Sequence, residues 1–516
     1  MSNSIQISTQ NSFMFCKSVW NNLSNRKYFL WGIVLSFVSF VIFKYLYPYP
    51  DFFSDSYSYL YAAANHMDVN VWPIGYSKFL EFIHICTSSD TALTAVQYFL
   101  IQIAELYLYF TIIYFFTTSM WTRRLLFLFL FVNPLTLYLA NTINSDALFA
   151  ALSLTWISQL IWAVQKPRAF SVIVQAILLV LSFTVRNNAY YYPLITLLGI
   201  SLSKQSLLSK FIGLGFSFLL LIAFIVYTEQ AAKKLTGISQ YSLFTGWQLA
   251  NNALYIYGQI KVDSTDFRTP ESKELNLISK RFYSHIKNRT NFQGYLAAYT
   301  GNFFIRQPES PLKQYRARHY YTKDELANII VWGKVSAIYK PFGQTIILHH
   351  PIAYARYFML PNLWNYLVPP LSHLAIYNYG DDTIDPIAQN WFRFPSQTIH
   401  VFSHKLQGNI LFIYQAFFLL INLFYLWYII KFTIHYRKFK QTTSDVPLHI
   451  IGLTFFLLNL GFNLVATVNI LRYQFFPMIA ILFLGLLMAD TWQIKILGTK
   501  QKDLVALNKA LQALPI

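Results

Sequence analysis

The chain has 516 residues, of which 55% are hydrophobic and 12% charged, and its aromatic residues reach 19%. Because a soluble domain averages roughly 25% charged residues, this composition excludes an ordinary soluble protein and favours one that crosses a lipid bilayer many times. The net charge of +19 would suit nucleic acid, but the basic residues form short clusters between apolar stretches, as charge that orients a membrane protein does, so we expect no nucleic-acid partner.

Apolar stretches long enough to cross a bilayer recur along most of the chain. A transmembrane helix needs about 20 apolar residues, and somewhat fewer where it is short or tilted. The sequence therefore predicts an all-α polytopic membrane protein with about ten transmembrane helices. The predicted spans are residues 28–47, 91–118, 125–140, 146–164, 170–186, 190–203, 211–228, 408–430, 448–467 and 473–490.

The positions of lysine and arginine predict the orientation of these spans. Short cytoplasmic loops carry an excess of both residues. If the segment 1–27 is cytoplasmic, the basic clusters of the loops and of the tail 491–516 all fall on that side. We therefore expect both termini in the cytoplasm, and we predict a bacterial inner membrane as the location. The loop clusters are at 123–124, 166–168, 204–210 and 431–440.

Two segments on the opposite, outer side are long. The first, 48–90, is the first outer loop of a membrane module that we place at 28–228. The second, 229–407, carries charges of both signs, aromatic residues and several prolines. Long translocated segments escape the charge rule, so we interpret 229–407 as a mainly helical outer domain. The C-terminal transmembrane helices follow at 408–490.

Two carboxylates, Asp51 and Asp55, lie where the chain first leaves the bilayer. A carboxylate beside a membrane is costly to desolvate, which favours a role in chemistry on a lipid-carried substrate. Their spacing puts both on one face if the segment is helical. Alternatively, Asp55 caps the helix that follows. The pair is also a candidate site for a divalent cation, whereas the histidines lack the tight spacing of a metal site.

A second group of candidate residues follows the turn at 73–76. Lys78 stands near the start of a predicted helix, where a cation opposes the helix dipole. This placement favours an anionic partner such as a phosphate, while a lysine that merely extends its amine to the interface is the alternative. Tyr76, within the same turn, is a candidate for the wall of a substrate pocket.

Three further outer turns bring polar groups to the same membrane level. Asp146 begins the fourth predicted span, Arg186 ends the fifth, and Arg472 opens the tenth. An outer arginine works against the orientation rule, and a guanidinium has the fork geometry to bind phosphate oxygens. Interfacial arginines that only extend to the headgroups are the alternative.

The outer domain contains one polar and aromatic run, at 246–252. It resembles the wall of a pocket for a sugar or a lipid headgroup, and ordinary helix packing is the alternative. The full set of candidate pocket residues is Tyr57, Tyr76, Trp247, Asn251 and Tyr473.

Taken in order, these motifs resemble those of the GT-C superfamily of integral-membrane glycosyltransferases, which includes the protein O-mannosyltransferases and the bacterial lipid A aminoarabinose transferases. The resemblance covers mainly residues 28–205 and 448–490 and leaves the outer domain unassigned. It rests on the segment 51–57, the Pro-x-Gly-Tyr turn at 73–76, Asn133-Pro134, Ser145-Asp146, Arg186 and Arg472-Tyr473.

The resemblance implies a sugar donor linked to a polyprenyl phosphate and a glycan, lipid or protein acceptor. It implies that Asp55 acts beside the acceptor, with Asp146 as a second acidic position and Asp51 as a further candidate. It also implies that Arg186, Arg472 and Lys78 bind the donor phosphate. The expected enzyme inverts the anomeric centre and requires no cofactor or metal.

The chain departs from the family at Trp72, where relatives often have arginine. The paired acidic motif of the metal-dependent members is also not evident. Two other functions remain open. A lipid-linked polysaccharide polymerase or ligase shares the lipid-phosphate chemistry. A lipid flippase or transporter would use broken helices, and Asn133-Pro134 interrupts one span.

Overall fold

The computed structural model describes residues 14–286, 302–437, 439 and 445–493. Within these ranges the chain is helical, with no strand and two isolated bridges, Asp51 with Thr142 and Thr383 with Thr398. Of the predicted terminal segments, residues 1–13 and 494–516 lie outside the described part.

Eight helical stretches of the described chain are long and apolar enough to cross a membrane, which confirms a polytopic all-α membrane protein. They are Leu23–Leu46 (α2), Asp90–Phe115 (α5), Met120–Ala140 (α6 and α7), Asp146–Gln165 (α8), Leu207–Thr236 (α11), Leu406–Ile434 (α21 and α22), Val446–Ala466 (α24) and Leu471–Gln493, which contains α25.

The two other predicted spans coincide with shorter apolar helices, α9 (Ala169–Val185) and α10 (Tyr192–Leu202), joined by the short 3₁₀ helix η1 (Asn187–Tyr191). At 1.5 Å per residue the 11 residues of α10 extend only about 16 Å, roughly half of a bilayer core. The prediction of ten full spans is therefore confirmed for eight of them.

The predicted span 125–140 is interrupted at Asn133-Pro134, where α6 (Met120–Phe131) ends and α7 (Pro134–Ala140) begins. Proline at the first helical position lacks an N–H that would be unpaired there in any case. The Asn133 side chain accepts a hydrogen bond from the backbone N–H of Leu135 at 3.1 Å and so caps the second helix.

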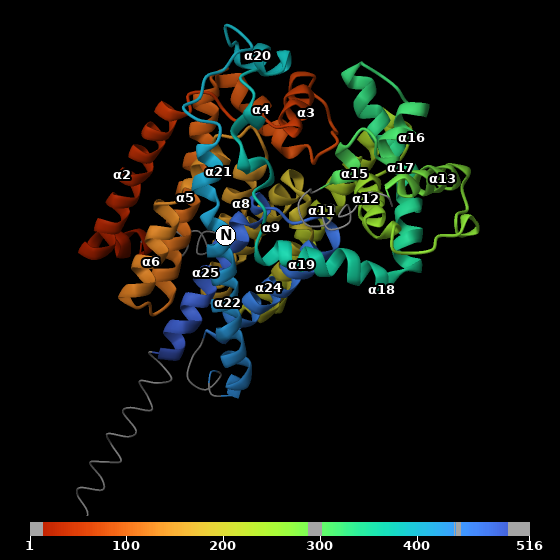
Figure 1. Cartoon of the computed structure of the whole chain (residues 1–516). Coiled ribbons are helices and arrows are strands. Elements are labelled where there is room, and N and C mark those ends of the chain that lie inside the picture. The colour runs from red at the N-terminus through yellow and green to blue at the C-terminus, as the bar shows by residue number, and fades with distance from the viewer. Residues whose placement is uncertain (1–13, 287–301, 438, 440–444, 494–516) are drawn as a thin grey trace, which may run out of the picture.

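The segment 48–90, predicted as the first outer loop, folds into two helices, α3 (Ser54–Ala64) and α4 (Gly75–Cys86). Figure 1 shows them with α20 (Pro386–Phe392) at the upper end of the helical bundle. Phe52, Tyr59 and Leu80 of this loop share a buried cluster with Phe392. The loop therefore covers the ends of the membrane helices, and it brings the acidic segment to that level.

The segment after α11 forms a body beside the bundle (Figure 1), with a buried core of its own. Within it, Gly246 of α12 and Gly343 of α17 allow close helix packing, because a Cβ at Gly246 would lie 1.7 Å from the Ser336 carbonyl oxygen. α11 continues to Thr236, beyond the predicted boundary at 229. The helices here are α12 (Thr245–Tyr257), α13 (Pro270–Ile286), α15 (Phe303–Arg306), α16 (Pro311–His319) and α17 (Glu325–His349).

The chain returns to the bundle through short helices. A four-residue helix, a π-helical turn and α19 lead on to two 3₁₀ turns that lie among the membrane helices, since Leu374 and Tyr377 belong to the main core of the bundle. These elements are α18 (Pro351–Tyr354), η3 (Ala355–Met359), α19 (Leu360–Leu367), η4 (Ser372–Ala375) and η5 (Tyr377–Gly380). The C-terminal part of the bundle contains α22 (Ile413–Ile434), α24 and α25 (Phe475–Asp490), the last preceded by η6 (Leu471–Gln474).

Candidate functional site

Four charged side chains from distant parts of the chain meet at one level of the bundle. Asp55 lies in the first turn of α3, Asp146 begins α8, Arg186 follows the last residue of α9, and Arg472 lies in η6. Helix dipoles favour acids at helix N-termini and bases at C-termini, which suits the first three. Arg472 stands instead at the start of its helix and therefore depends on the carboxylates around it. We call these four residues the ion cluster.

Asp146 is the centre of the ion cluster, because both guanidinium groups donate to it. Arg472 Nη1 lies 3.2 Å from one carboxylate oxygen, and Arg186 Nη1 contacts the other. Arg472 Nη2 also donates to Asp55 at 3.2 Å. The side chains of Asp146 and Arg472 are each 5% exposed. Buried charges of this kind persist only when paired, and here each arginine has a carboxylate partner.

Aromatic rings support both arginines. The guanidinium carbons of Arg186 and Arg472 lie 5.0 and 5.1 Å from the ring centre of Tyr473. Arg472 also lies 5.5 Å from the ring of Phe53. Such cation–π contacts are stronger in a desolvated site than at a surface. Tyr473, a predicted pocket residue, is thus in direct contact with the ion cluster.

A small cavity adjoins the ion cluster. Arg472 Nε is buried and has no hydrogen-bond partner among the described residues. A buried N–H without a partner is rare, and it marks a place where an oxygen-rich ligand would gain a hydrogen bond. The cavity is lined by Asp146, Phe149, Ala150, Arg186, Asn188, Arg472, Tyr473, Phe475 and Phe476.

A third guanidinium stands on the far side of Phe53. Arg306, at the end of α15, donates to Nε2 of His373, whose ring lies 4.7 Å from that of Phe53. Nδ1 of His373 lies 2.6 Å from the hydroxyl of Tyr379. Burial, together with the charges of Arg306 and Arg472, lowers the pKa of His373 to about 2. The imidazole is therefore neutral at physiological pH.

This neutral state fixes the hydrogen-bond directions. Because Nε2 accepts from Arg306, Nδ1 carries the proton and donates to the Tyr379 oxygen. The Tyr379 O–H is then left to donate to a third group. Arg306 is exposed and makes no ion pair with a carboxylate in the described part of the chain. With the ion cluster, the site holds three guanidinium groups and two carboxylates.

Asp51 lies outside the helix that contains Asp55, because α3 begins only at Ser54. The prediction that both share one helical face is therefore wrong. Asp51 is fully buried and accepts a hydrogen bond from the backbone N–H of Asn378 at 2.8 Å. Burial raises its pKa to about 8, so it is largely protonated at neutral pH. It holds a strained turn, since Asn378 and Tyr379 have positive φ angles of 46° and 54°.

The alternative that Asp55 caps the following helix is also wrong. Phe53 is the N-cap residue of α3, and its backbone N–H donates to the Ser56 hydroxyl at 2.8 Å. The Asp55 carboxylate is thus left for Arg472. Asp51 and Asp55 point to different partners, and no group of three potential metal ligands occurs among the described residues.

Five other predicted site residues lie apart from the ion cluster, with no hydrogen bond or ion pair to it among the described residues. Lys78 pairs with Glu81 at 2.9 Å. Tyr57 stacks on Phe52, and buried Tyr76 donates to Gln97 at 2.7 Å. Trp247 and Asn251 are buried in the body beside the bundle. Their roles in a substrate pocket stay predictions.

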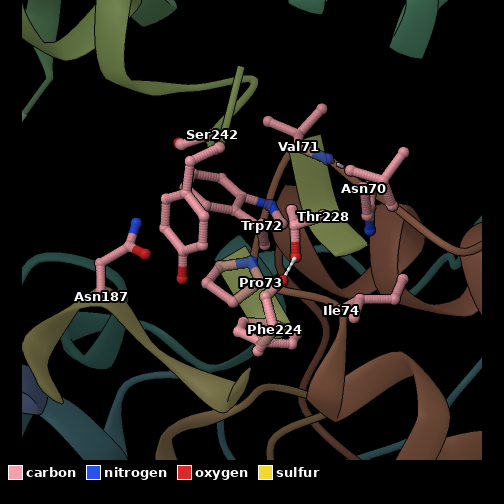
Figure 2. Close-up of a pocket in the computed structure, with 11 residues that line it drawn as sticks. Asn70, Val71, Trp72, Pro73, Ile74, Asn187, Phe224, Thr228 and Ser242 are labelled. Carbon is pink, nitrogen blue, oxygen red and sulfur yellow. Dashed lines mark hydrogen bonds between the residues drawn. The ribbon is translucent and has the colours of Figure 1, made fainter. Parts of the chain in front are cut away.

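A second small pocket adjoins η1. Asn187 lines this pocket, whereas its neighbour Asn188 lines the cavity beside the ion cluster. Figure 2 shows Trp72 and Pro73 at its centre and Asn187 to one side. We call it the Trp72 pocket; it is lined by Val69, Asn70, Val71, Trp72, Pro73, Ile74, Asn187, Phe224, Thr228, Tyr241 and Ser242.

Sequence reasoning missed Arg306, His373 and Tyr379. They lie in short elements of the segment 302–380, which carries no recognisable motif, and tertiary packing around Phe53 brings His373 near the ion cluster. No family model matches the chain, and neither a curated protein nor a solved structure shows significant similarity to it.

Proposed function

We propose that this protein is a membrane glycosyltransferase of the GT-C type, which moves a sugar from a polyprenyl-phosphate donor to an acceptor on the outer side of a bacterial inner membrane. The observation that supports the proposal is the ion cluster beside its cavity, at the ends of the membrane helices. A lipid-linked phosphate would sit at this depth, with its tail between apolar helices.

The balance of charge at the site favours an anionic ligand. The two carboxylates of the ion cluster neutralise Arg186 and Arg472, and Arg306 adds a positive charge that is held by a neutral imidazole. A donor phosphate would therefore find one excess positive charge and the unpaired Nε–H of Arg472. Guanidinium groups bind phosphate oxygens with matched geometry.

The proposed reaction uses Asp55 as the general base. The phosphate competes for Arg472, which frees the Asp55 carboxylate from its ion pair. Asp55 then takes the proton of an acceptor hydroxyl as that oxygen bonds to the anomeric carbon of the sugar. The bond from this carbon to the phosphate oxygen breaks, and the lipid phosphate leaves with the electron pair. Arginines stabilise its growing charge, and attack from the opposite face inverts the anomeric centre.

In this proposal both termini are cytoplasmic, and the reaction needs no cofactor. Asp146 acts as a positioning residue that fixes both arginines. Asp51 acts through the backbone of Asn378 rather than on the substrate. A divalent cation at Asp51 and Asp55 would need both side chains to leave their present partners.

The test is the Asp55→Asn variant, purified and placed in proteoliposomes with polyprenyl-phosphate sugars and an extract of outer-face glycans, lipids and proteins as acceptors. We expect transfer of labelled sugar to fall by at least about 100-fold, the usual size of a lost general base. Glu309→Gln, at an exposed carboxylate, is the matched control and should retain full activity.

Product analysis separates the rival functions in the same assay. A single added sugar supports the proposal, whereas transfer of a whole chain would indicate a polymerase or ligase. Movement of lipid across the bilayer without acceptor, at equal rates in the wild type and Asp55→Asn, would indicate a flippase. Normal sugar transfer by Asp55→Asn would remove Asp55 from the mechanism.

A further inference from the structure

Large apolar side chains form a stripe on the surface where α17 ends and α18, η3 and α19 follow it. Their exposed fractions lie between 61% and 83%. Exposed apolar side chains that gather in one patch mark a surface that contacts another partner or a membrane. We call this patch the apolar stripe; it consists of Leu348, Ile352, Leu360 and Trp364.

The stripe stays on one side of the chain because of a change in helix type. Residues four apart in an α-helix are offset by about 40° around its axis, so a stripe with this spacing drifts. The π-turn η3 has more residues per turn than an α-helix, and it therefore rotates the stripe back. Tyr354, Phe358 and Tyr366 of the same elements are buried in the two cores of the molecule. One face of 351–367 thus packs on protein and the other is free.

Hydrogen bonds attach these elements to the end of the membrane helix α24. The Tyr354 hydroxyl donates to the Val465 carbonyl at 2.7 Å, and the Asn362 side chain donates to the Asn463 carbonyl at 2.8 Å. Val465 and Leu457, on one face of α24, are themselves exposed apolar residues of a spanning helix. Figure 1 shows α18 and α19 along the lower edge of the body beside the bundle, next to α24. The apolar stripe therefore continues the lipid-facing surface of α24.

The charge of this segment also suits a bilayer. Residues 351–370 contain one charged side chain, Arg356, and no acidic one. Arg356 is exposed, and an arginine side chain is long enough to keep its charge among lipid headgroups while its stem stays in apolar surroundings. Helices that lie on a membrane have this combination of an apolar face and basic residues.

We propose that α18, η3 and α19 form one in-plane membrane helix, whose apolar stripe is immersed in the leaflet at the end of α24. Such helices bury their apolar face about 5–10 Å into the boundary between headgroups and acyl chains. The body beside the bundle would then rest on the bilayer surface through this helix.

The in-plane helix also contacts the segment that leads to the ion cluster. Asn362 Oδ1 accepts from the backbone N–H of Asn469 at 2.8 Å, and the Pro370 carbonyl accepts from the Leu471 N–H at 2.9 Å. Arg472 is the next residue. The helix thereby fixes the depth of Arg472 relative to the bilayer surface, whatever reaction the site performs. The inference does not rest on the proposed function, and either can fail alone.

The test measures which solvent covers the stripe, in the full chain reconstituted in nanodiscs that hold one chain each. Cys16 and Cys86, both exposed, are first replaced by serine. A nitroxide spin label is then attached in Ile352→Cys, Leu360→Cys or Trp364→Cys. Its collisions with oxygen, which concentrates in lipid, and with a water-soluble nickel chelate are measured by electron paramagnetic resonance.

Two label positions serve as references. Tyr321→Cys is the matched control, because Tyr321 is 74% exposed and precedes Glu325, the first residue of α17, whereas the stripe begins at the other end of that helix. Leu457→Cys marks the lipid-facing surface of α24. Because an in-plane helix excludes water from its apolar face, the ratio of oxygen to nickel collisions at the stripe should exceed that at Tyr321→Cys by at least about fivefold. It should approach the ratio at Leu457→Cys.

Two results would overturn the proposal. A ratio at the stripe equal to that at Tyr321→Cys would show that water covers it. Labels shielded from oxygen and nickel alike would show that protein covers it, as another part of this chain or a tightly bound partner would. Because all three substitutions are at exposed positions, a variant that fails to fold can be replaced by either of the others.

Discussion

The ion cluster and the buried amides of α12, in the body beside the bundle, are both polar, and both join segments that are far apart in the chain. They differ in where their hydrogen bonds end. Asn251 Oδ1 accepts from the backbone of Phe304 at 3.2 Å, and Asn252 Nδ2 donates to the Ala466 carbonyl at 3.0 Å, at the end of α24. These amides satisfy backbone groups that a helix end or turn would otherwise leave unpaired.

In the ion cluster, charged side chains pair with one another, and one donor of Arg472 stays unpaired beside a cavity. Buried side chains that hydrogen-bond to backbone groups stabilise the fold, because they replace the hydrogen bonds that those groups would otherwise make to water. Buried charged side chains that pair with one another and leave one donor unpaired are typical of a functional site, where a ligand can replace one of the partners.

The largest effect is expected at Asp146. Asp146→Asn leaves two arginines with one carboxylate between them in a buried site, which lowers the free energy of unfolding by about 3–5 kcal/mol. Asn251→Ala, the neutral counterpart, should cost about 1–3 kcal/mol. Thermal unfolding in nanodiscs measures both. Equal losses in the two variants would contradict the distinction between the regions.

A smaller effect is expected from pH, through Asp51 and His373. The folded-state pKa of Asp51 is raised to about 8, so the folded chain holds a proton that the unfolded chain releases above about pH 4, and stability falls as pH rises. The folded-state pKa of His373 is lowered to about 2, so stability falls as pH drops below 6.5. Between about pH 4 and 6.5 the two effects oppose each other.

Above pH 6.5 only the Asp51 effect remains. It should reduce the free energy of unfolding by about 2 kcal/mol between pH 6.5 and 8. In Asp51→Asn this alkaline loss should disappear, because an amide does not titrate. The check is the difference between the unfolding curves of the wild type and the variant across that range. Parallel curves would mean that Asp51 is ionised in the folded protein.

Much of the fold follows from hydropathy, because bilayer thickness fixes the length of a spanning helix. Eight predicted spans recur in the structure. The same logic located the ion cluster, since residues at span ends on one side of the bilayer share one level: Asp55, Asp146, Arg186 and Arg472 meet there. The chemical roles of these residues stay a prediction.

What the sequence did not reveal depends on tertiary packing. Asp51 falls outside α3 because the Phe53 backbone and the Ser56 hydroxyl start the helix later than the i, i+4 spacing suggested. His373 and Tyr379 pack on the ring of Phe53 beside the ion cluster, and Arg306 is joined to them through His373. No local pattern encodes such contacts, because they join residues more than 200 positions apart.

The smallest effect is expected at Lys78, and it tests a residue that the family resemblance would place on the donor phosphate. Its amine pairs with Glu81 at 2.9 Å, and its side chain is 39% exposed. An exposed pair of this kind contributes less than about 1 kcal/mol to stability. Lys78→Ala should therefore unfold almost as the wild type does. Because Glu81 already neutralises the charge of Lys78, the KM for the donor should change less than twofold in Lys78→Ala. Arg306→Gln, in contrast, removes the excess positive charge of the site and should raise the donor KM several-fold. A large rise in donor KM for Lys78→Ala alone would show that the lysine leaves Glu81 to bind the phosphate, and the anion site would then extend along α4 rather than across Phe53.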